Sequence, residues 1–334
     1  MNFVPSYINT LNNGDFESRL RDAAKILQSC TSCPRNCNVD RTSGEYGICQ
    51  SGSLPIVSSY TPHFGEEPVL SGSRGAGNIF FGNCNLRCVF CQNYVISQNY
   101  KTEIKNEVSH ERLAKIMLEL QDKNCHNIGL VSPTHFSASI LESIYLAAVK
   151  GLALPIIYNT NGYDSVEMLK LYDGVIDIYL PDFKYGENSA GKTYSKVSDY
   201  FDAVKPAIEE MYRQVGGELI YEDGVVVRGL IIRHLVMPNG LAETENVFRF
   251  IADLDPGIHI SLMAQYYPSN KADKYPLISR NISSTEYMRS IELLDKFGLQ
   301  NGWVQEMESM ESYRPFFQET REDPFKNSLQ KREP

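Results

Sequence analysis

Three of the eight cysteines lie close together, as Cys84, Cys88 and Cys91, with the spacing C-x3-C-x2-C directly after the apolar run 78–81. Thiolates this close on one loop can converge on one metal centre. Structural zinc sites normally have four ligands, whereas this loop supplies three thiols and has no histidine within easy reach. The loop therefore predicts an iron–sulfur cube in which one iron lacks a protein ligand. A three-cysteine zinc knuckle is the simpler alternative.

Four further cysteines lie within twenty residues near the N-terminus, with the spacing C-x2-C-x3-C-x11-C: Cys30, Cys33, Cys37 and Cys49. This spacing differs from the paired CxxC of a zinc ribbon. The group is a second candidate metal site, and the sequence leaves an auxiliary iron–sulfur cluster, structural zinc and free thiols all open. Cys125, the remaining cysteine, precedes a predicted strand and is expected to be a small buried apolar residue.

Polar residues follow successive predicted strands beyond the cysteine loop. They are Ser132-Pro133-Thr134-His135, Asn159-Thr160-Asn161-Gly162 and Asp182-Phe183-Lys184, with Arg233, His234, Gln265 and Tyr267 on the last two strands. The carboxyl ends of parallel strands meet at one mouth of a barrel, where active sites of such folds lie. We therefore expect these side chains to surround one site.

The elements that position these residues alternate along the chain. Short apolar runs predict strands at 78–82, 127–131, 155–159, 175–180, 229–236 and 259–265, and helical periodicity recurs between them, at Leu113 to Leu120 and at Ile140 to Ala148. Alternation of this kind predicts parallel βαβ units and an α/β fold. Asp223-Gly224 predicts a hairpin turn within 219–227, and Ser283 to Glu286 fits a capping box.

Three segments follow from this pattern. Residues 1–76 are expected to be an N-terminal helix and Cys-rich extension, with an irregular link over 52–77. Residues 77–308 are expected to form a partial (β/α)6 TIM-like barrel. Residues 309–334 form a polar tail whose end is expected to be disordered, with Tyr313, Phe316 and Phe317 able to dock.

The composition excludes several classes of protein. A net charge of −9 and a pI near 5.3 disfavour nucleic acid and anionic membranes as partners. The N-terminus shows no signal peptide, and no apolar run approaches the ~18 residues of a membrane span. We expect a cytoplasmic protein whose cysteines are ligands rather than disulfides.

The motif CNLRCVFC, from Cys84 to Cys91, resembles the C-x3-C-x-Φ-C signature of the radical SAM superfamily, with Phe90 as the aromatic residue Φ. The resemblance implies that these three cysteines hold a [4Fe-4S] cluster whose fourth iron binds S-adenosylmethionine. One electron from the cluster then cleaves the cofactor to methionine and a 5′-deoxyadenosyl radical, which abstracts hydrogen from a substrate.

The same resemblance implies a set of cofactor-binding residues. Phe90 is expected to pack near adenine, and Ser132 and Thr134 stand where many members carry a Gly-Gly-Glu turn for the amino group. Asn159 and the Asp182-x-Lys184 pair resemble cofactor contacts of glycyl-radical activating enzymes, although Asn159 replaces the usual Asp. The simpler interpretations are loop turns for Ser132-Pro133 and Asn161-Gly162 and an ordinary ion pair for Asp182 with Lys184.

The sequence leaves two interpretations open for His135 and two for the loop before the first strand. His135 fits a proton donor near the substrate or a structural histidine, while His234 and His259 are expected in the core. The segment 62–68, with His63, Glu66 and Glu67, either faces the site or is an exposed loop.

A CPRxCxVDR-type knot, a PHFGEEP segment and FFxxCNLxCxFCQN together resemble the branch of pyruvate formate-lyase activating enzyme-like proteins. This implies a flavodoxin or ferredoxin as electron donor and a glycyl-radical enzyme as substrate. Another peptide or a small metabolite is the alternative substrate, and a non-catalytic iron–sulfur or zinc protein is the alternative of another class.

Overall fold

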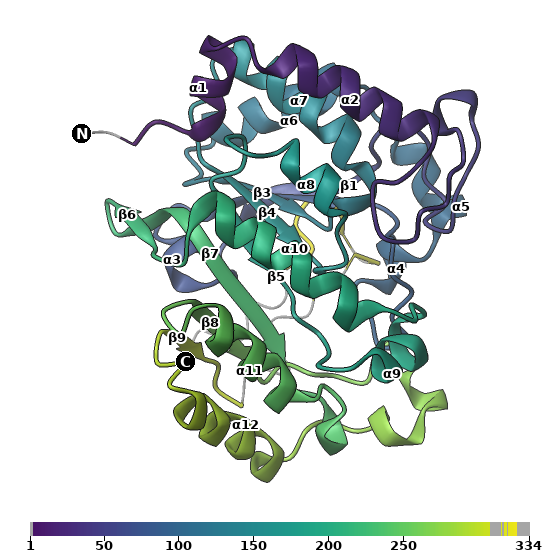
Figure 1. The fold of residues 1–334 in the computed structure, drawn as a ribbon. Coiled ribbons are helices and arrows are strands. Elements are labelled where there is room, and N and C mark those ends of the chain that lie inside the picture. Colours follow the sequence, from purple (N-terminus) through teal and green to yellow (C-terminus); the bar gives the residue numbers. More distant parts are fainter. Residues whose placement is uncertain (1–2, 308–314, 316, 319, 326–334) are drawn as a thin grey trace.

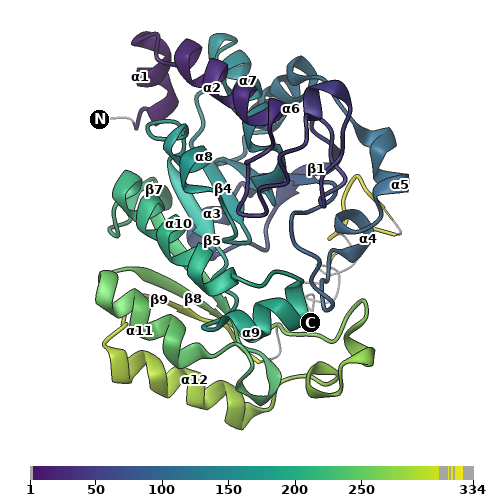
Figure 2. The same cartoon turned by 45° about the vertical axis from the view of Figure 1, so that its right-hand side comes forward.

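The computed structural model describes residues 3–307, 315, 317–318 and 320–325. Figures 1 and 2 show a curved, mostly parallel sheet with helices packed on its outer side. The strands are β1 (Val57–His63), β2 (Ala76–Phe81), β3 (Ile128–Val131), β4 (Ile156–Thr160), β5 (Ile178–Pro181), β6 (Ile220–Glu222), β7 (Val225–Leu235), β8 (His259–Met263) and β9 (Gly302–Val304).

The sheet has the order β1-β2-β3-β4-β5-β7-β8-β9, and β6 pairs with β7 as a hairpin arm. Pairing is parallel from β2 through β9, whereas β1 is antiparallel to β2. All residues of β2, β4 and β5 are buried, as expected for parallel strands covered on both faces. The result is an open, partial (β/α) barrel with a Cys-rich extension, as predicted.

Twelve α-helices are found in the described residues. They are α1 (Ser6–Asn12), α2 (Phe16–Gln28), α3 (Pro68–Ser71), α4 (Tyr94–Ser97), α5 (Tyr100–Glu103), α6 (His110–Asp122), α7 (Ser137–Val149), α8 (Val166–Lys170), α9 (Asn188–Ala190), α10 (Tyr200–Val215), α11 (Thr244–Leu254) and α12 (Ser284–Phe297). α1 and α2 pack on α7, outside the βα layer (Figure 1). No helix of this described part is long and apolar enough to cross a membrane.

The six predicted parallel strands are confirmed within a few residues at their ends. The hairpin turn at Asp223-Gly224 and the capping box of α12, in which Ser283 and Glu286 bond each other's backbone, are also confirmed.

The irregular link expected over 52–77 is wrong for 57–63 and for Pro68–Ser71, which form β1 and α3. β1 pairs with β2 from His63 back to Val57, so the sheet begins before the expected boundary at 77. Its serines and proline hid it in the sequence, because the strand is stabilised by its pairing with β2 rather than by an apolar run.

The described part of the C-terminal tail lies against β1, β2 and α5, near α4 (Figure 2). Phe317 and Phe325 are buried against Phe80 of β2, with ring centroids 5.4 and 5.7 Å away. Docking of Phe317 is therefore confirmed. The expected docking of Tyr313 and Phe316 and the expected disorder of the chain end fall outside the described residues.

Candidate active site

The cysteine loop follows β2 and lies at the carboxyl edge of the sheet. Ser195 Oγ is 3.0 Å from Cys88 Sγ, and Ser97 Oγ is 3.3 Å from Cys91 Sγ. The backbone N–H of Leu86 donates to Cys84 Sγ over 3.4 Å. Each thiol therefore has a polar neighbour, as the sulfurs of iron–sulfur centres commonly do.

Burial raises the pKa of Cys84 and of Cys88 to about 11, and it raises the pKa of Cys91 as well. Each thiolate also raises the pKa of another of the three, so the sulfurs lie near one another. Buried thiolates require a compensating positive charge, which bound iron supplies. The donor set and its environment thus fit an iron–sulfur cluster.

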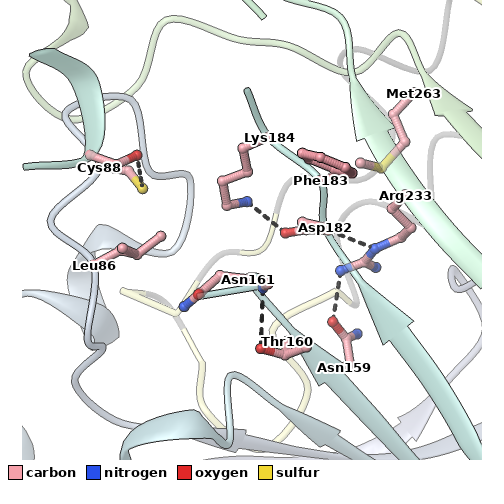
Figure 3. Close-up of polar contacts among 12 residues, drawn as sticks. Leu86, Cys88, Asn159, Thr160, Asn161, Asp182, Phe183, Lys184, Arg233 and Met263 are labelled. Carbon is pink, nitrogen blue, oxygen red and sulfur yellow. Dashed lines mark hydrogen bonds and ion pairs between the residues drawn. The ribbon is translucent and has the colours of Figure 1, made fainter. Parts of the chain in front are cut away.

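A chain of charged and polar groups runs across the strand ends beside this loop (Figure 3). Lys184 Nζ lies 2.6 Å from Asp182 Oδ2, and Arg233 Nε lies 2.8 Å from Asp182 Oδ1. Arg233 Nη2 donates to Asn159 Oδ1 over 2.7 Å, and Nη1 lies 3.4 Å from Glu66 Oε2. Arg233, on β7, thus contacts side chains on three other segments: β4, the residues after β5, and the segment 62–68.

Backbone register explains this convergence. A parallel bridge joins Asp182 to Arg233, and the N–H of Phe183 donates to the carbonyl of Arg233 over 2.8 Å. In the pairing of β4 with β5, Asn159 lies opposite Leu180, which is two residues before Asp182. Side chains of neighbouring parallel strands at matched positions point to the same face, so the three polar groups meet.

Electrostatics keep the central groups charged. Burial alone would raise the pKa of Asp182, but the charges of Arg233 and Lys184 outweigh burial and hold it below its usual value. Burial would lower the pKa of Lys184, yet Asp182 and the nearby Cys88 raise it. Charged groups of both signs therefore lie together, as binding of a zwitterionic ligand requires.

A cavity of about 480 Å³ opens onto both the cysteine loop and this charged chain. Of the residues predicted from the sequence, those on its wall are Cys88, Phe90, Cys91, Asn159, Asp182, Lys184 and Arg233, and Phe90 packs on the ring of Tyr266 at 5.7 Å. Gln265 and Tyr267, which were expected at the mouth, also line it. The structure thus gathers residues from five strands at one site.

Ser132 and Thr134 are not on the described wall of this cavity. Thr134 is buried, and its hydroxyl lies 2.9 Å from that of Thr160, which in turn donates to Asp164. The backbone N–H of Ser132 donates to the carbonyl of Asn159 over 2.8 Å. Their expected role toward the cofactor stays a prediction.

The histidines have structural partners. His135 Nε2 is 2.8 Å from the carbonyl oxygen of Gly82, and burial lowers its pKa to about 3. His234 lies between the carbonyl of Phe183 and the hydroxyl of Thr244. The proton-donor interpretation of His135 gains no support, and His234 lies in the core as expected. Cys125 is also buried as expected.

Several site residues escaped the sequence analysis. Ser195 precedes a left-handed residue, Lys196, in a loop far from the cysteines in sequence. Ser261 and Trp303 sit on β8 and β9, and Glu66 and Glu67 line the cavity from the segment 62–68 that was left open between site and exposed loop. The paired glutamates flanked by Gly65 and Pro68 were the available signal.

The N-terminal thiols also lie near one another. Burial raises the pKa of Cys33 to about 12, and the charges of Cys49, Cys30 and Cys37 add to that effect. Within the described ranges, no three His, Cys, Asp or Glu side chains are arranged as ligands of a single metal ion, and this holds for the cysteine loop at 84–91 as well. Neither zinc nor a second cluster is shown by this arrangement, so both stay predictions.

This extension packs on the cysteine loop. Asn83 Nδ2 donates to the carbonyl of Gln50 over 2.9 Å, and Arg87 Nη2 donates to that of Ile48 over 2.5 Å. Arg35 donates to the carbonyls of Asn85 and Lys196. Both thiol groups are therefore held in one rigid neighbourhood.

Comparison with known proteins identifies the family. The Radical SAM superfamily model matches residues 78–217, which contain the cysteine loop and most of the charged chain. This chain belongs to the radical SAM superfamily. An uncharacterized protein of Methanocaldococcus jannaschii, MJ0674, is 38% identical over 286 residues, which cover 83% of this chain and 77% of the relative.

Two further similarities are weaker. Another uncharacterized M. jannaschii protein, MJ0808, is 27% identical over 157 residues, 42% of this chain and 45% of that protein. A solved structure of TYW1 with a lysine-pyruvate adduct bound covers 70% of this chain and 78% of its own, with 11% identity and a TM-score of 0.43. Membership in the superfamily makes the protein a radical SAM enzyme.

Proposed function

We propose that this radical SAM enzyme abstracts hydrogen from a small molecule rather than from a folded glycyl-radical enzyme. The observation that carries the proposal is the cavity of about 480 Å³, which is partly open to solvent and whose wall joins the cysteine loop to the charged chain. Cavities for single small ligands measure about 300–1,000 Å³, and S-adenosylmethionine takes part of this volume, so the space that remains suits a small substrate rather than a protein loop.

The residues of this chain fit the cofactors in chemical type. Cys84, Cys88 and Cys91 hold three irons of a [4Fe-4S] cluster. When bound, the cluster and S-adenosylmethionine supply one-electron cleavage of the sulfonium and a radical that takes hydrogen from a carbon.

The charged chain and the aromatic wall orient the second cofactor. Lys184 and Arg233 are cations for its carboxylate, while Asn159 and Asp182 offer oxygens to its ammonium group. Phe90, packed on Tyr266, provides a buried aromatic surface for adenine. Burial of these groups excludes water from the reacting centre.

The C-terminal segment supports the small-substrate proposal. Pro315 and Phe325 belong to the cavity wall, and Phe325 lies 4.0 Å from the ring of His63 between centroids. A glycyl-radical enzyme would need to insert a protein loop beside these residues. Activation of such an enzyme would therefore require this segment to move.

An external reductant must supply the electron, and we propose a flavodoxin or ferredoxin. Each cleavage of the cofactor consumes one electron, which a small protein carrier of this kind can deliver. The Cys-rich extension packs directly on the cysteine loop, so it provides the protein surface beside the cluster.

The test is anaerobic reconstitution with iron and sulfide, then dithionite and S-adenosylmethionine, with 5′-deoxyadenosine measured by chromatography. Wild type is expected to form 5′-deoxyadenosine, and Cys88→Ala to form none because one iron loses its ligand. Cys125→Ala is the matched control, since this buried cysteine lies before β3, away from the cavity wall. A fully loaded wild-type cluster that gives no product would refute the proposed chemistry.

A further inference from the structure

Glu67 differs from every other charged residue of the cavity. It is 9% exposed, it lines the cavity, and its Oε2 atom has no hydrogen-bond partner among the described residues. A buried carboxylate oxygen without a partner costs free energy, on the order of 1–3 kcal/mol or more. Such an atom is retained most readily where a ligand completes its bonding.

The neighbouring groups do not provide a free cation for Glu67. Arg233 contacts Asp182, Asn159 and Glu66. Glu66 is itself held, since its Oε1 accepts from Asn78 Nδ2 over 2.8 Å. Burial, which is the largest influence, raises the pKa of Glu67, and the charge of Arg233 lowers that pKa without outweighing burial.

The charges on the described wall are unequal. Its carboxylates belong to Glu66, Glu67, Asp182 and Glu306, and its cations to Lys184 and Arg233. The wall thus has four carboxyl groups for two cations, and Asp182 contacts both of these cations, so the carboxyl groups in excess are those of the glutamates. This end of the cavity therefore favours a positively charged ligand group.

An aromatic surface accompanies the glutamates. Trp303 lines the same cavity on β9, directly beside Ser261 of β8. Tryptophan is the aromatic side chain that best attracts a cation over its face. The hydroxyl of Ser261 donates to the Glu67 carboxyl group and lowers its pKa, which leaves Oε2 as the oxygen without a partner.

We propose that the cavity end formed by Glu66, Glu67, Ser261 and Trp303 binds a cationic nitrogen of the substrate, an ammonium or a guanidinium group. This inference rests on the proposed function, because it names the substrate class of the same cavity. The cationic group would anchor the substrate at the glutamates while its remaining carbons extend toward the cysteine loop.

The test measures binding without turnover. Isothermal titration calorimetry is run on reconstituted full-length protein kept without reductant, once saturated with S-adenosylmethionine and once without it. The probes are n-butylammonium and n-butylguanidinium, with 1-butanol as the neutral analogue and butyrate as the anionic one. At least one cationic probe is expected to bind, and at least tenfold more tightly than butanol or butyrate.

Glu67→Gln is expected to weaken binding of the cationic probe at least tenfold, because glutamine keeps the shape of glutamate but lacks its charge. Glu292→Gln, which changes an exposed glutamate of α12, is the matched control and should bind like wild type. Circular dichroism checks that each variant is folded. The preference of the wild-type protein for cationic probes is measured without any variant, so it tests the inference independently.

Four results would overturn the inference: no binding of either cation, equal or tighter binding of butanol or butyrate, no effect of Glu67→Gln, or binding that S-adenosylmethionine abolishes. The last would assign the glutamates to the cofactor. Loss of 5′-deoxyadenosine formation in wild type would instead refute the proposed function, and because probe binding has its own readout, the two failures are distinguishable.

Discussion

Asp182 is the residue on which the charged chain depends. Its two oxygens face Lys184 and Arg233 separately, at 2.6 and 2.8 Å, and its side chain is 17% exposed. Removing one member of such a buried set leaves the other charges uncompensated, which costs more than the intact pair contributes.

We predict that Asp182→Asn lowers the free energy of unfolding by about 3 kcal/mol and weakens binding of S-adenosylmethionine at least about tenfold. Thermal unfolding and equilibrium dialysis measure the two effects. Asp173→Asn is the control, because Asp173 pairs with Arg213 at the surface, where such pairs contribute about 1 kcal/mol or less. Equal effects of both variants would contradict the assigned role of Asp182.

At this scale, sequence reasoning succeeds where chemistry follows strand ends. The cysteine loop and the Asp182–Lys184 pair were predicted because each directly follows a recognisable apolar strand. A place for Glu67 in the site was one of two interpretations that the sequence left open, and Ser195 was missed. Both residues reach the site on segments that fold in from outside the βα units. No local periodicity encodes such a contact.

One buried cation, Arg41, contributes to holding the N-terminal extension on the barrel. Arg41 is 1% exposed, donates to the carbonyls of Gly52 and, over 2.6 Å, His135, and lies 5.7 Å from the ring centroid of Phe136. One guanidinium thus joins the Cys-rich segment to the loop after β3, which requires the planar, multiple donors of arginine.

We predict that Arg41→Lys destabilises the protein by about 2 kcal/mol, because a single ammonium cannot serve both carbonyls in this geometry. Hydrogen exchange should increase first in residues 30–52. Arg289→Lys, on the surface of α12, should change neither measurement. Unchanged exchange in the extension of Arg41→Lys would show that other contacts hold it.

Element by element, the strands with apolar runs were predictable and the others were not. β1 and α1 were missed because both are rich in polar residues, and both are stabilised by tertiary contacts. α1 is tied to the barrel by Asp177, whose Oδ1 accepts from the N–H of Ser6 over 2.8 Å. Such partners, 171 positions apart in the chain, leave no local pattern.

Across the whole molecule, the C-terminal segment returns from the β9 side to the β1 side. Arg321 contacts Glu103, whose side chain is fully buried, at 2.7 and 3.0 Å, and the hydroxyl of Ser59 donates to the carbonyl of Arg321. These contacts hold Phe325 at the cavity wall. The sequence showed only a polar tail.

We predict that Arg321→Met lowers stability by about 3 kcal/mol, since it leaves the Glu103 carboxylate buried without its cation. Chemical denaturation measures this loss. Arg280→Met breaks the more exposed pair with Glu286 and should cost about 1 kcal/mol. If the two variants lost equal stability, the segment would not be anchored through Glu103.

The pH dependence of stability is also a property of the whole chain. Burial lowers the pKa of five histidines, namely His63, His126, His135, His234 and His259. The unfolded chain therefore binds more protons, and stability rises with pH up to about 6.5. Burial raises the pKa of Asp164 and Asp177 to about 6, which opposes this rise between about pH 4 and 6.

Burial also raises the pKa of Glu67 and Glu243, so four carboxyl groups oppose the five histidines. Because the histidines still outnumber these groups, we predict a net increase in stability from about pH 5 to 7. Asp164→Asn removes one opposing group and should make that increase steeper. Denaturation at a series of pH values measures both slopes. A stability that falls over this range would contradict the assigned burial of the histidines.

The central claim is that three cysteines leave one iron of a cluster open for S-adenosylmethionine beside the Asp182 chain. Mössbauer spectroscopy of protein reconstituted with isotopically labelled iron tests it directly. Adding S-adenosylmethionine is expected to change the signal of one iron of the four and leave the others, and this change should be weakened in Asp182→Asn. A spectrum in which no iron responds to the cofactor would contradict the account.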